Sequence, residues 1–232
     1  MSAASAHIAL HPFADGDTLA TALAQTVADD LRAALSERGK ASLALSGGST
    51  PKRFLQALSR QPLDWAKVTA TLVDERWVGE DSDRSNAALL RSSLLQHEAA
   101  AANFVSLYRA GIDVEPALPA IETALTPLLP LDVAVLGMGA DGHTASFFPG
   151  GDRLAEALDP ATPARVLPMR APGAGEPRIT LTLPVLLAAH HLYLHIEGAE
   201  KRAVLARAQA GDDLPVRAVL TQARAIGVFL TV

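Results

Sequence analysis

The alternation of short apolar segments with amphipathic segments is the feature that most constrains the fold of this chain. Five apolar runs have the length of buried strands, and helical periodicity fills most of the gaps between them: ASLAL (41–45), TATLV (69–73), LDVAVL (131–136), HLYLHI (191–196) and AIGVFL (225–230). Continuous apolar strands joined by helices are typical of a mainly parallel sheet that is covered on both faces. The sequence therefore predicts an α/β protein with three α/β/α layers, similar to a Rossmann fold.

The expected helices follow from apolar spacing and from start and stop signals. In the longest one, apolar residues recur every fourth position from Leu19 to Leu35; Asp17 or Thr18 can cap its start, and Gly39 ends it. Pro51 opens a helix to about Leu58. Ser85 can cap another that runs to Leu95. The remaining expected elements are helices in 121–129, 183–190 and 199–208, and shorter strands in 103–108, 165–169 and 178–182. The segment APGAGEP (171–177) reads as a mobile surface loop.

Composition limits the class of protein. A chain of 232 residues with 49% hydrophobic residues can bury a large core, and we expect one domain over residues 1–232. The absence of cysteine excludes disulfides and thiolate chemistry. A net charge of −5 gives no long-range attraction for nucleic acid or anionic lipid. The N-terminal stretch lacks the basic start of a signal peptide, and no apolar run could span a bilayer. We expect a cytoplasmic monomer or weak homodimer without nucleic-acid or membrane partners.

A glycine-rich turn follows the first apolar strand. In Ser46-Gly47-Gly48-Ser49-Thr50, two glycines let backbone N–H groups converge, and a helix begins directly afterwards. Such a loop can hold a phosphate without many charged side chains. It can equally be a tight turn with a threonine cap, and both interpretations remain open. The spacing of a P-loop is absent.

Charged residues end the second apolar strand. Asp74, Glu75 and Arg76 are consecutive, and charges at a strand end are costly unless they are solvated or paired. Taken alone, this stretch favours a solvated strand end or a structural ion pair.

The loop after the strand LDVAVL contains the pattern G-x-G-x-x-G. The sequence GMGADGH (137–143) could indicate a dinucleotide site, but residues 147–150 (FFPG) interrupt any following helix. The next strand also ends in Met and Arg instead of the acidic residue that would hold a ribose. We therefore interpret the glycines as bringing the backbone close to a ligand and presenting Asp141 and His143.

His143 is a candidate general base, because a loop histidine can titrate near neutral pH. It could instead be bonded to loop carbonyls. We expect His190, His191 and His195 to pack or to face solvent. No histidine pair has metal-ligand spacing with a carboxylate, so no metal is inferred. Two cations, Arg178 and Lys201, are each compatible with an ordinary surface position. Together, at the ligand edge of the sheet, they could bind a phosphate.

These segments together resemble a known family. LALSGGSTPKRF, VDERWV followed by SN, LGMGADGHTASFFPG, RITLTLPVLLAA and EGAEKRAVL occur in this order in the 6-phosphogluconolactonases, which share a superfamily with the glucosamine-6-phosphate isomerases/deaminases. The resemblance runs from about Leu43 to about Leu205. It implies the α/β/α fold of this sugar-phosphate superfamily and hydrolysis of 6-phospho-D-glucono-1,5-lactone in the oxidative pentose phosphate pathway. It implies a small sugar-phosphate lactone as the partner, and no cofactor.

The resemblance also assigns roles. The loop residues Gly47, Gly48, Ser49 and Thr50 would hold the phosphate, together with the two cations Arg178 and Lys201. Asp74 joins these substrate-binding residues. Arg76 would face the lactone end, and His143 would activate water. Asp141 would orient the imidazole or bind a sugar hydroxyl, and this alternative stays open.

Position 148 separates the two activities of the superfamily. The deaminase loop resembles DGHIAFNEPG, with a glutamate before the proline that helps to shuttle protons. Here that position is Phe148, which cannot do so, and this favours the lactonase chemistry. Two departures from the lactonase pattern, Gly79 after DERWV and a short C-terminus, touch no proposed catalytic residue.

Overall fold

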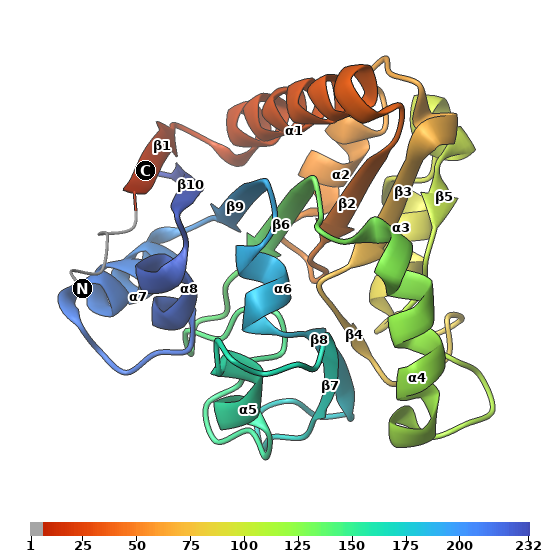
Figure 1. The fold of residues 1–232 in the computed structure, drawn as a ribbon. Coiled ribbons are helices and arrows are strands. Elements are labelled where there is room, and N and C mark those ends of the chain that lie inside the picture. The colour runs from red at the N-terminus through yellow and green to blue at the C-terminus, as the bar shows by residue number, and fades with distance from the viewer. Residues whose placement is uncertain (1–6) are drawn as a thin grey trace.

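The computed structural model describes residues 7–232, and a seven-stranded sheet forms its centre (Figure 1). The strand order is β1-β10-β9-β6-β2-β3-β5, and every neighbouring pair is parallel. This confirms the predicted mainly parallel sheet. The strands are β1 His7–Phe13, β2 Ala41–Leu45, β3 Val68–Leu72, β5 Asn103–Phe104, β6 Val133–Gly137, β9 His191–Ile196 and β10 Ala225–Thr231. Part of the N-terminal stretch that we inspected for a leader, residues 1–6, lies outside the described residues.

Helices connect these strands, and the fold is the predicted three-layer arrangement. Eight α-helices are described in residues 7–232: α1 Gly16–Arg38, α2 Lys52–Leu58, α3 Asn86–Ser93, α4 Val114–Leu125, α5 Leu154–Leu158, α6 Leu183–Leu187, α7 Ala199–Ala210 and α8 Val216–Gln222. Short 3-10 turns cover Trp65–Lys67, His97–Ala101 and Thr126–Leu128. Figure 1 shows α1 and α2 side by side along one side of the sheet.

The longest helix begins two residues earlier than its sequence signals suggested. The cap of α1 is Asp15, whose carboxylate accepts from the backbone N–H groups of Asp17 and Thr18, so the prediction that Asp17 or Thr18 is the cap is wrong. The end is as expected, because Gly39 adopts a left-handed conformation (φ 71°) that ends the helix. Ser85 caps α3 as predicted, by accepting from the N–H of Ala88.

A second, smaller sheet lies below the first in Figure 1. Its strand order is β4-β8-β7, and both neighbouring pairs are antiparallel. The strands are β4 Asp74–Arg76, β8 Arg178–Leu181 and β7 Val166–Met169. The strands expected in 165–169 and 178–182 therefore exist, but they pair outside the main sheet. In this register Arg76 lies opposite Arg178 and Asp74 opposite Thr180. The second sheet thus brings two charged segments together that lie about a hundred positions apart in the chain.

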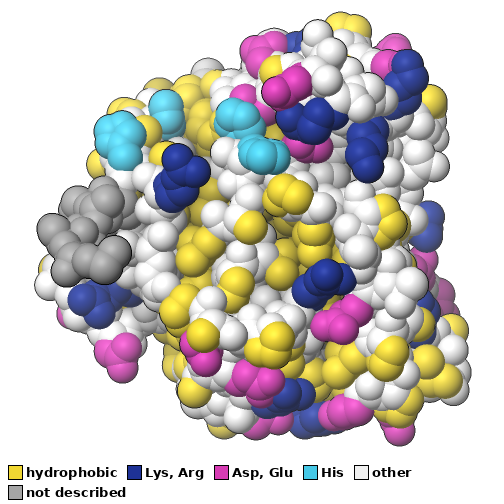
Figure 2. Space-filling model, in the orientation of Figure 1, with side chains coloured by type: hydrophobic (Ala, Val, Ile, Leu, Met, Phe, Trp, Pro, Cys, Tyr) yellow, Lys and Arg dark blue, Asp and Glu magenta, His cyan; other side chains and the backbone are white. Residues whose placement is uncertain are grey.

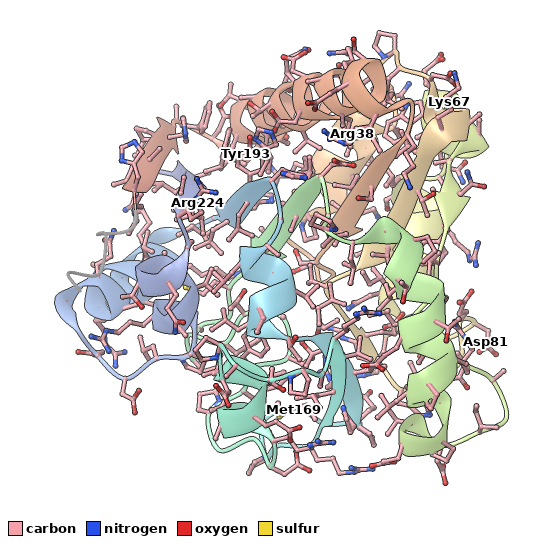
Figure 3. The ribbon with its side chains drawn as sticks, in the orientation of Figure 1. Arg38, Lys67, Asp81, Met169, Tyr193 and Arg224 are labelled. Atoms are coloured by element: carbon pink, nitrogen blue, oxygen red, sulfur yellow. The ribbon has the colours of Figure 1, made fainter. Side chains whose placement is uncertain are left out.

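Polar contacts fix the first helical layer to the sheet at the edge opposite the pocket described below. The Tyr193 hydroxyl of β9 donates to Asp30 of α1 at 2.6 Å, and Arg38 at the end of α1 pairs with the buried Asp132 (Figure 3). Histidine side chains gather over β1 and β9 on the face seen in Figure 2, where they line a shallow hollow: His7, His11, His190 and His191. His190 and His191 are exposed, as expected.

Two features are absent from residues 7–232, a membrane-spanning helix and a metal-binding cluster. No helix in this range combines the length and the apolar character needed to cross a bilayer. Over the same residues, histidine and carboxylate side chains do not form a cluster of three that could hold a metal ion.

Candidate active site

A pocket of about 240 Å³ opens where the carboxyl ends of β2, β3, β6 and β9 meet the second sheet. This is the edge at which parallel α/β sheets bind ligands. The pocket is lined by residues from distant parts of the chain, which include nearly all of the predicted site residues: Gly47, Gly48, Ser49, Thr50, Asp74, Arg76, His143, Arg178 and Lys201. Asp141 does not line the pocket and instead contacts His143. The structure therefore brings the predicted residues to one place.

The glycine-rich turn after β2 forms one wall of the pocket. A Cβ atom on Gly47 would lie only 1.9 Å from Oδ1 of Asn86, so this position requires glycine. Gly48 has φ +91°, a conformation that favours glycine. The Nζ of Lys201, from α7, donates to Oγ1 of Thr50 at 3.1 Å. Burial lowers the pKa of Lys201, and the nearby Glu197 and Glu200 oppose this effect. The turn and one of the two predicted cations are thus in direct contact.

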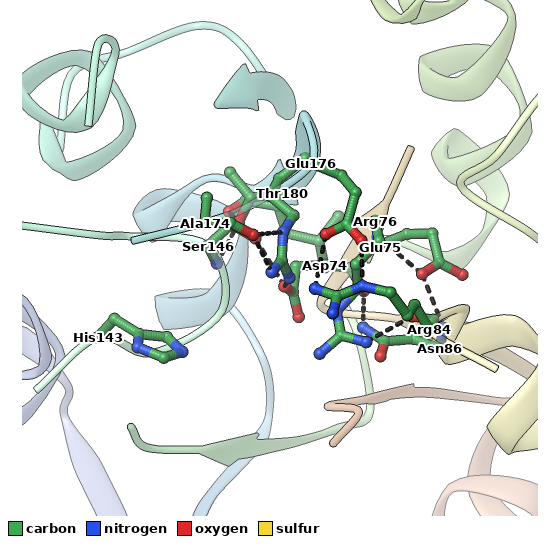
Figure 4. Close-up of polar contacts among 12 residues, drawn as sticks. Asp74, Glu75, Arg76, Arg84, Asn86, His143, Ser146, Ala174, Glu176 and Thr180 are labelled. Atoms are coloured by element: carbon green, nitrogen blue, oxygen red, sulfur yellow. Dashed lines mark hydrogen bonds and ion pairs between the residues drawn. The ribbon is translucent and has the colours of Figure 1, made fainter. Parts of the chain in front are cut away.

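Glu75 is completely buried at the centre of a polar network below the pocket (Figure 4). Its carboxylate accepts from four donors: the N–H groups of Arg76 (2.7 Å), Asn86 (2.8 Å) and Ala87 (2.7 Å), and the hydroxyl of Ser85 (3.1 Å). Burial raises the pKa of Glu75, and the backbone hydrogen bonds act against that rise. The carboxylate joins β4 to the start of α3, and it thereby fixes the backbone that carries Arg76 and Asn86.

Asp74 is also buried, and it faces the second sheet. Its Oδ2 accepts from the Ser146 hydroxyl at 2.6 Å and lies 3.9 Å from Nη1 of Arg178, while its backbone carbonyl accepts from Asn86 at 2.9 Å. Our expectation that the DERWV stretch is a solvated strand end is wrong for Asp74 and Glu75, because both are paired and less than a tenth exposed. The alternative of a structural ion pair fits the contact between Asp74 and Arg178.

Arg178 is 6% exposed, so it is not an ordinary surface cation. Its Nη2 donates to the carbonyl of Ala174 at 2.6 Å, and its guanidinium carbon lies 5.2 Å from the centre of the Phe148 ring. Burial lowers the pKa of Arg178, while Asp74 raises it. The segment 171–177, expected as a surface loop, contributes the buried Ala174 and also Glu176, which pairs with Arg84.

Arg76 lies across the strand pair from Arg178. Its Nη1 donates to the carbonyl of Arg84, and its Nε is buried without a hydrogen-bond partner in the described part of the chain. The guanidinium is held at one end and still has donors for a ligand. Figure 4 shows Arg76 and Arg84 grouped on one side of the site, with His143 standing apart from them.

His143 is paired with Asp141. The imidazole Nδ1 lies 2.5 Å from Oδ1 of Asp141, and the same oxygen accepts from the His143 backbone N–H at 3.1 Å. Burial raises the pKa of Asp141, but the charge and hydrogen bonds of His143 outweigh burial and hold it below the usual value. In a neutral imidazole that donates Nδ1–H to this carboxylate, Nε2 is the nitrogen without a proton. The alternative of bonding only to loop carbonyls does not describe this ring.

Two neighbours fix the plane of that imidazole. The Phe148 ring stacks on it with centroids 4.3 Å apart and an interplanar angle of 27°. On the other wall, a Cβ atom at Gly139 would lie 2.3 Å from both Cε1 and Nδ1 of His143, so the glycine makes room for the ring. The second glycine of the G-x-G-x-x-G pattern therefore serves close approach to a side chain.

Replacing Glu75 with glutamine should lower the free energy of unfolding by about 3 kcal/mol, because buried donors lose their charged acceptor. For a chain of this length, that corresponds to a fall in Tm of about 6–12 °C. Calorimetry of Glu75→Gln beside Glu98→Gln, at an exposed carboxylate, measures the effect. Equal Tm values for the two variants would contradict the central position of Glu75.

Comparison with known proteins shows which family has this site. Residues 14–227 match the family described as "Glucosamine-6-phosphate isomerases/6-phosphogluconolactonase". The chain belongs to this family. A relative from Rhizobium meliloti named 6-phosphogluconolactonase is 56% identical and covers 92% of this chain and 94% of its own. A relative of the same name from Mesorhizobium japonicum is 53% identical, covering 94% and 92%. The crystal structure of a 6-phosphogluconolactonase from Shewanella baltica matches with a TM-score of 0.90 and 39% identity, covering 97% and 98%.

Membership of the glucosamine-6-phosphate isomerase/6-phosphogluconolactonase family confirms the resemblance inferred from the sequence, and it identifies the protein as an enzyme. Asn86 and His195 are polar pocket residues that the sequence did not point to. Both have a buried side-chain atom without a hydrogen-bond partner in the described residues, Oδ1 and Nδ1 respectively. Asn86 could have been found from the SN pair that follows DERWV in the family pattern. For His195, the expectation that it packs or faces solvent is incomplete, because the side chain is buried and also lines the pocket.

Proposed function

We propose that this enzyme hydrolyses 6-phospho-D-glucono-1,5-lactone to 6-phospho-D-gluconate, the lactonase step of the oxidative pentose phosphate pathway, in the cytoplasm. The observation that carries the proposal is the pair Asp141–His143, held against Phe148 at the wall of a pocket that also contains three cations. The names of relatives that share half or more of their residues with this chain support the same substrate.

His143 is proposed as the general base. With Nδ1–H directed to Asp141, Nε2 can take a proton from a water molecule as that water attacks the lactone carbonyl. A lactone is an activated ester, so no covalent nucleophile is needed. General-base assistance is worth about 10²–10⁴ in rate. Of the two roles that the sequence left open for Asp141, we propose that it orients the ring and stabilises the imidazolium; its contact with Nδ1 of His143 supports this role.

Arg76 is proposed to stabilise the oxyanion. The carbonyl oxygen becomes negative in the tetrahedral intermediate, and a pre-positioned donor there is worth about 3 kcal/mol. Arg76 has an unpartnered buried Nε, and its Nη1 is fixed by the Arg84 carbonyl. Directing this guanidinium at the developing charge therefore costs little reorganisation free energy.

The glycine-rich turn and Lys201 are proposed to bind the phosphate, with Arg178 and Asp74 completing the substrate contacts. Converging N–H groups of Gly47, Gly48, Ser49 and Thr50 suit phosphate oxygens, and Lys201 adds a full charge beside Thr50. Arg178 lies opposite Arg76 in the strand register. We therefore place it against the middle of the substrate, between the phosphate and the lactone carbonyl.

The test is catalysed loss of freshly generated 6-phosphogluconolactone, measured against its spontaneous hydrolysis. We expect a rate proportional to enzyme concentration, and no release of ammonia or ketose from glucosamine 6-phosphate. Phe148 motivates the second expectation, because its ring stacks on His143 and cannot shuttle a proton. Ammonia release without lactone hydrolysis would instead assign the isomerase/deaminase activity.

A further inference from the structure

His195 is a buried histidine that the proposed reaction does not use. It lies near the end of β9, is 2% exposed, and lines the same pocket as Thr50 and Lys201. Its Nε2 lies 3.1 Å from Oε1 of Glu197. Its Nδ1 is buried and has no hydrogen-bond partner in residues 7–232. An unpartnered polar atom of this kind is costly in a folded protein, and it calls for a ligand.

The charges around His195 come from three elements. Glu197 follows β9, Lys201 lies on α7 and Arg53 on α2; the ring of Phe54 meets the imidazole edge-on at 6.1 Å between centroids. Burial is the main cause that lowers the pKa of His195 to about 4; Glu197 acts against it, and Lys201 and Arg53 add to it. Without a ligand, the ring is therefore neutral at physiological pH.

The contact with Glu197 determines which nitrogen carries the proton of that neutral ring. A carboxylate can only accept, so Nε2 keeps its hydrogen and Nδ1 is left with a lone pair. A phosphate dianion also has only acceptor oxygens. A phosphate oxygen that approaches Nδ1 therefore cannot form a favourable hydrogen bond with it unless Nδ1 gains a proton.

We propose that His195 is a specificity-determining residue that couples phosphate binding to the uptake of one proton. The proton comes from solvent and adds to the Nδ1 lone pair, with no bond to the substrate formed or broken. The resulting imidazolium donates from Nε2 to Glu197 and from Nδ1 to a phosphate oxygen. This inference rests on the proposed function, because it takes the end of the pocket at Thr50 and Lys201 as the phosphate end.

Proton uptake gives the pocket a defined pH dependence. The bound dianion raises the pKa of His195 above its ligand-free value, so the complex holds one more proton than the free components between those two values. Affinity for the phosphorylated ligand should then fall by up to about tenfold for each unit of rising pH in that window. Phosphate monoesters have a second pKa near 6, so between pH 7.5 and 8.5 the ligand itself stays dianionic.

Calorimetric titration of the full-length enzyme with 6-phosphogluconate tests this inference. At pH 7.5, in two buffers of different ionisation enthalpy, we expect net proton uptake by the wild type and close to none by His195→Gln. Glutamine can still contact Glu197 but cannot be protonated. The matched control His190→Gln, at an exposed histidine outside this pocket, should retain the uptake. Equal uptake by the wild type and His195→Gln would overturn the proposal.

A measurement on the wild type keeps the test independent of how His195→Gln folds. Burial also lowers the pKa of Lys201, so that amine is a second group able to take up a proton. Nitrogen-15 chemical shifts of the histidine rings should show Nδ1 of His195 changing from unprotonated to protonated when 6-phosphogluconate binds. An Nδ1 that stays unprotonated in the complex would contradict the inference. Binding without proton uptake would leave the proposed function intact, whereas absence of both binding and lactone hydrolysis would contradict the proposed function itself.

Discussion

His143→Ala should lower kcat for 6-phosphogluconolactone hydrolysis by about 10²–10⁴-fold, the usual contribution of a general base. The reason is local: the imidazole of His143 lies at the pocket wall with Nδ1 engaged by Asp141, so Nε2 is the nitrogen proposed to take the proton from water. The affinity for 6-phosphogluconate should change little, because the loop and cation proposed to hold the phosphate lie on other elements. The rate is measured on freshly generated lactone, with spontaneous hydrolysis subtracted.

The control for this variant is His190→Ala, at an exposed histidine outside the pocket. It should leave kcat within about twofold of the wild type, since surface substitutions away from special features have small effects. A second variant should displace the same imidazole without removing it. In Gly139→Ala, the new methyl group would overlap the His143 ring, and kcat should fall while the ring remains present. Wild-type turnover in His143→Ala would exclude the proposed base.

The elements that sequence could predict are those whose signals are local. Helix α1 shows its apolar residues every fourth position, and β2 is a continuous apolar run, so both were found within a few residues. Strand β1 was missed because it lies at the edge of the sheet and none of its residues is buried. Its seven residues are mostly exposed or half-buried, so they carry no apolar run.

The second sheet could not be predicted because its pairing is non-local. Strand β4 pairs with β8, which lies about a hundred residues later in the chain, and three consecutive charged residues do not indicate a strand. The burial of Glu75 is hidden for the same reason. Its partners are mainly backbone N–H groups at the start of α3, and a sequence does not show where those groups point.

The contacts of the site can likewise be divided into those between residues close in the sequence and those between distant residues. Asp141 and His143 are two positions apart, so their contact could be expected from the loop alone. The stack of His143 on Phe148 also lies within that loop. By contrast, the contact of Lys201 with Thr50 spans 151 positions, and only the fold or a family resemblance could bring the two together. His195 carries no local signal at all, since one histidine in an apolar strand resembles any packed core residue.

The contact between Lys201 and Thr50 leads to the second large expected effect. Lys201→Met should raise KM for 6-phosphogluconolactone by about 10–150-fold, because a hydrogen bond to a charged group contributes about 1.5–3 kcal/mol. Methionine keeps much of the length of the side chain but removes its charge, and Lys201 is the lysine that contacts the glycine-rich turn at 3.1 Å. For unphosphorylated glucono-1,5-lactone, KM should change little, since that substrate has no group to meet the ammonium.

The matched control is Lys52→Met, an exposed lysine at the start of α2 beside the same turn. It removes one positive charge close to the site without altering a residue that lines the pocket. If general electrostatic attraction explains the affinity, both variants should raise KM for the phosphorylated lactone to a similar extent. The difference between each variant and the wild type should then become smaller as salt screens exposed charges. If Lys201 binds the phosphate directly, only its variant should show the large rise in KM, and the loss should persist at high ionic strength. Equal losses on phosphorylated and unphosphorylated lactone would show that Lys201 supports the fold of the pocket and does not recognise the phosphate.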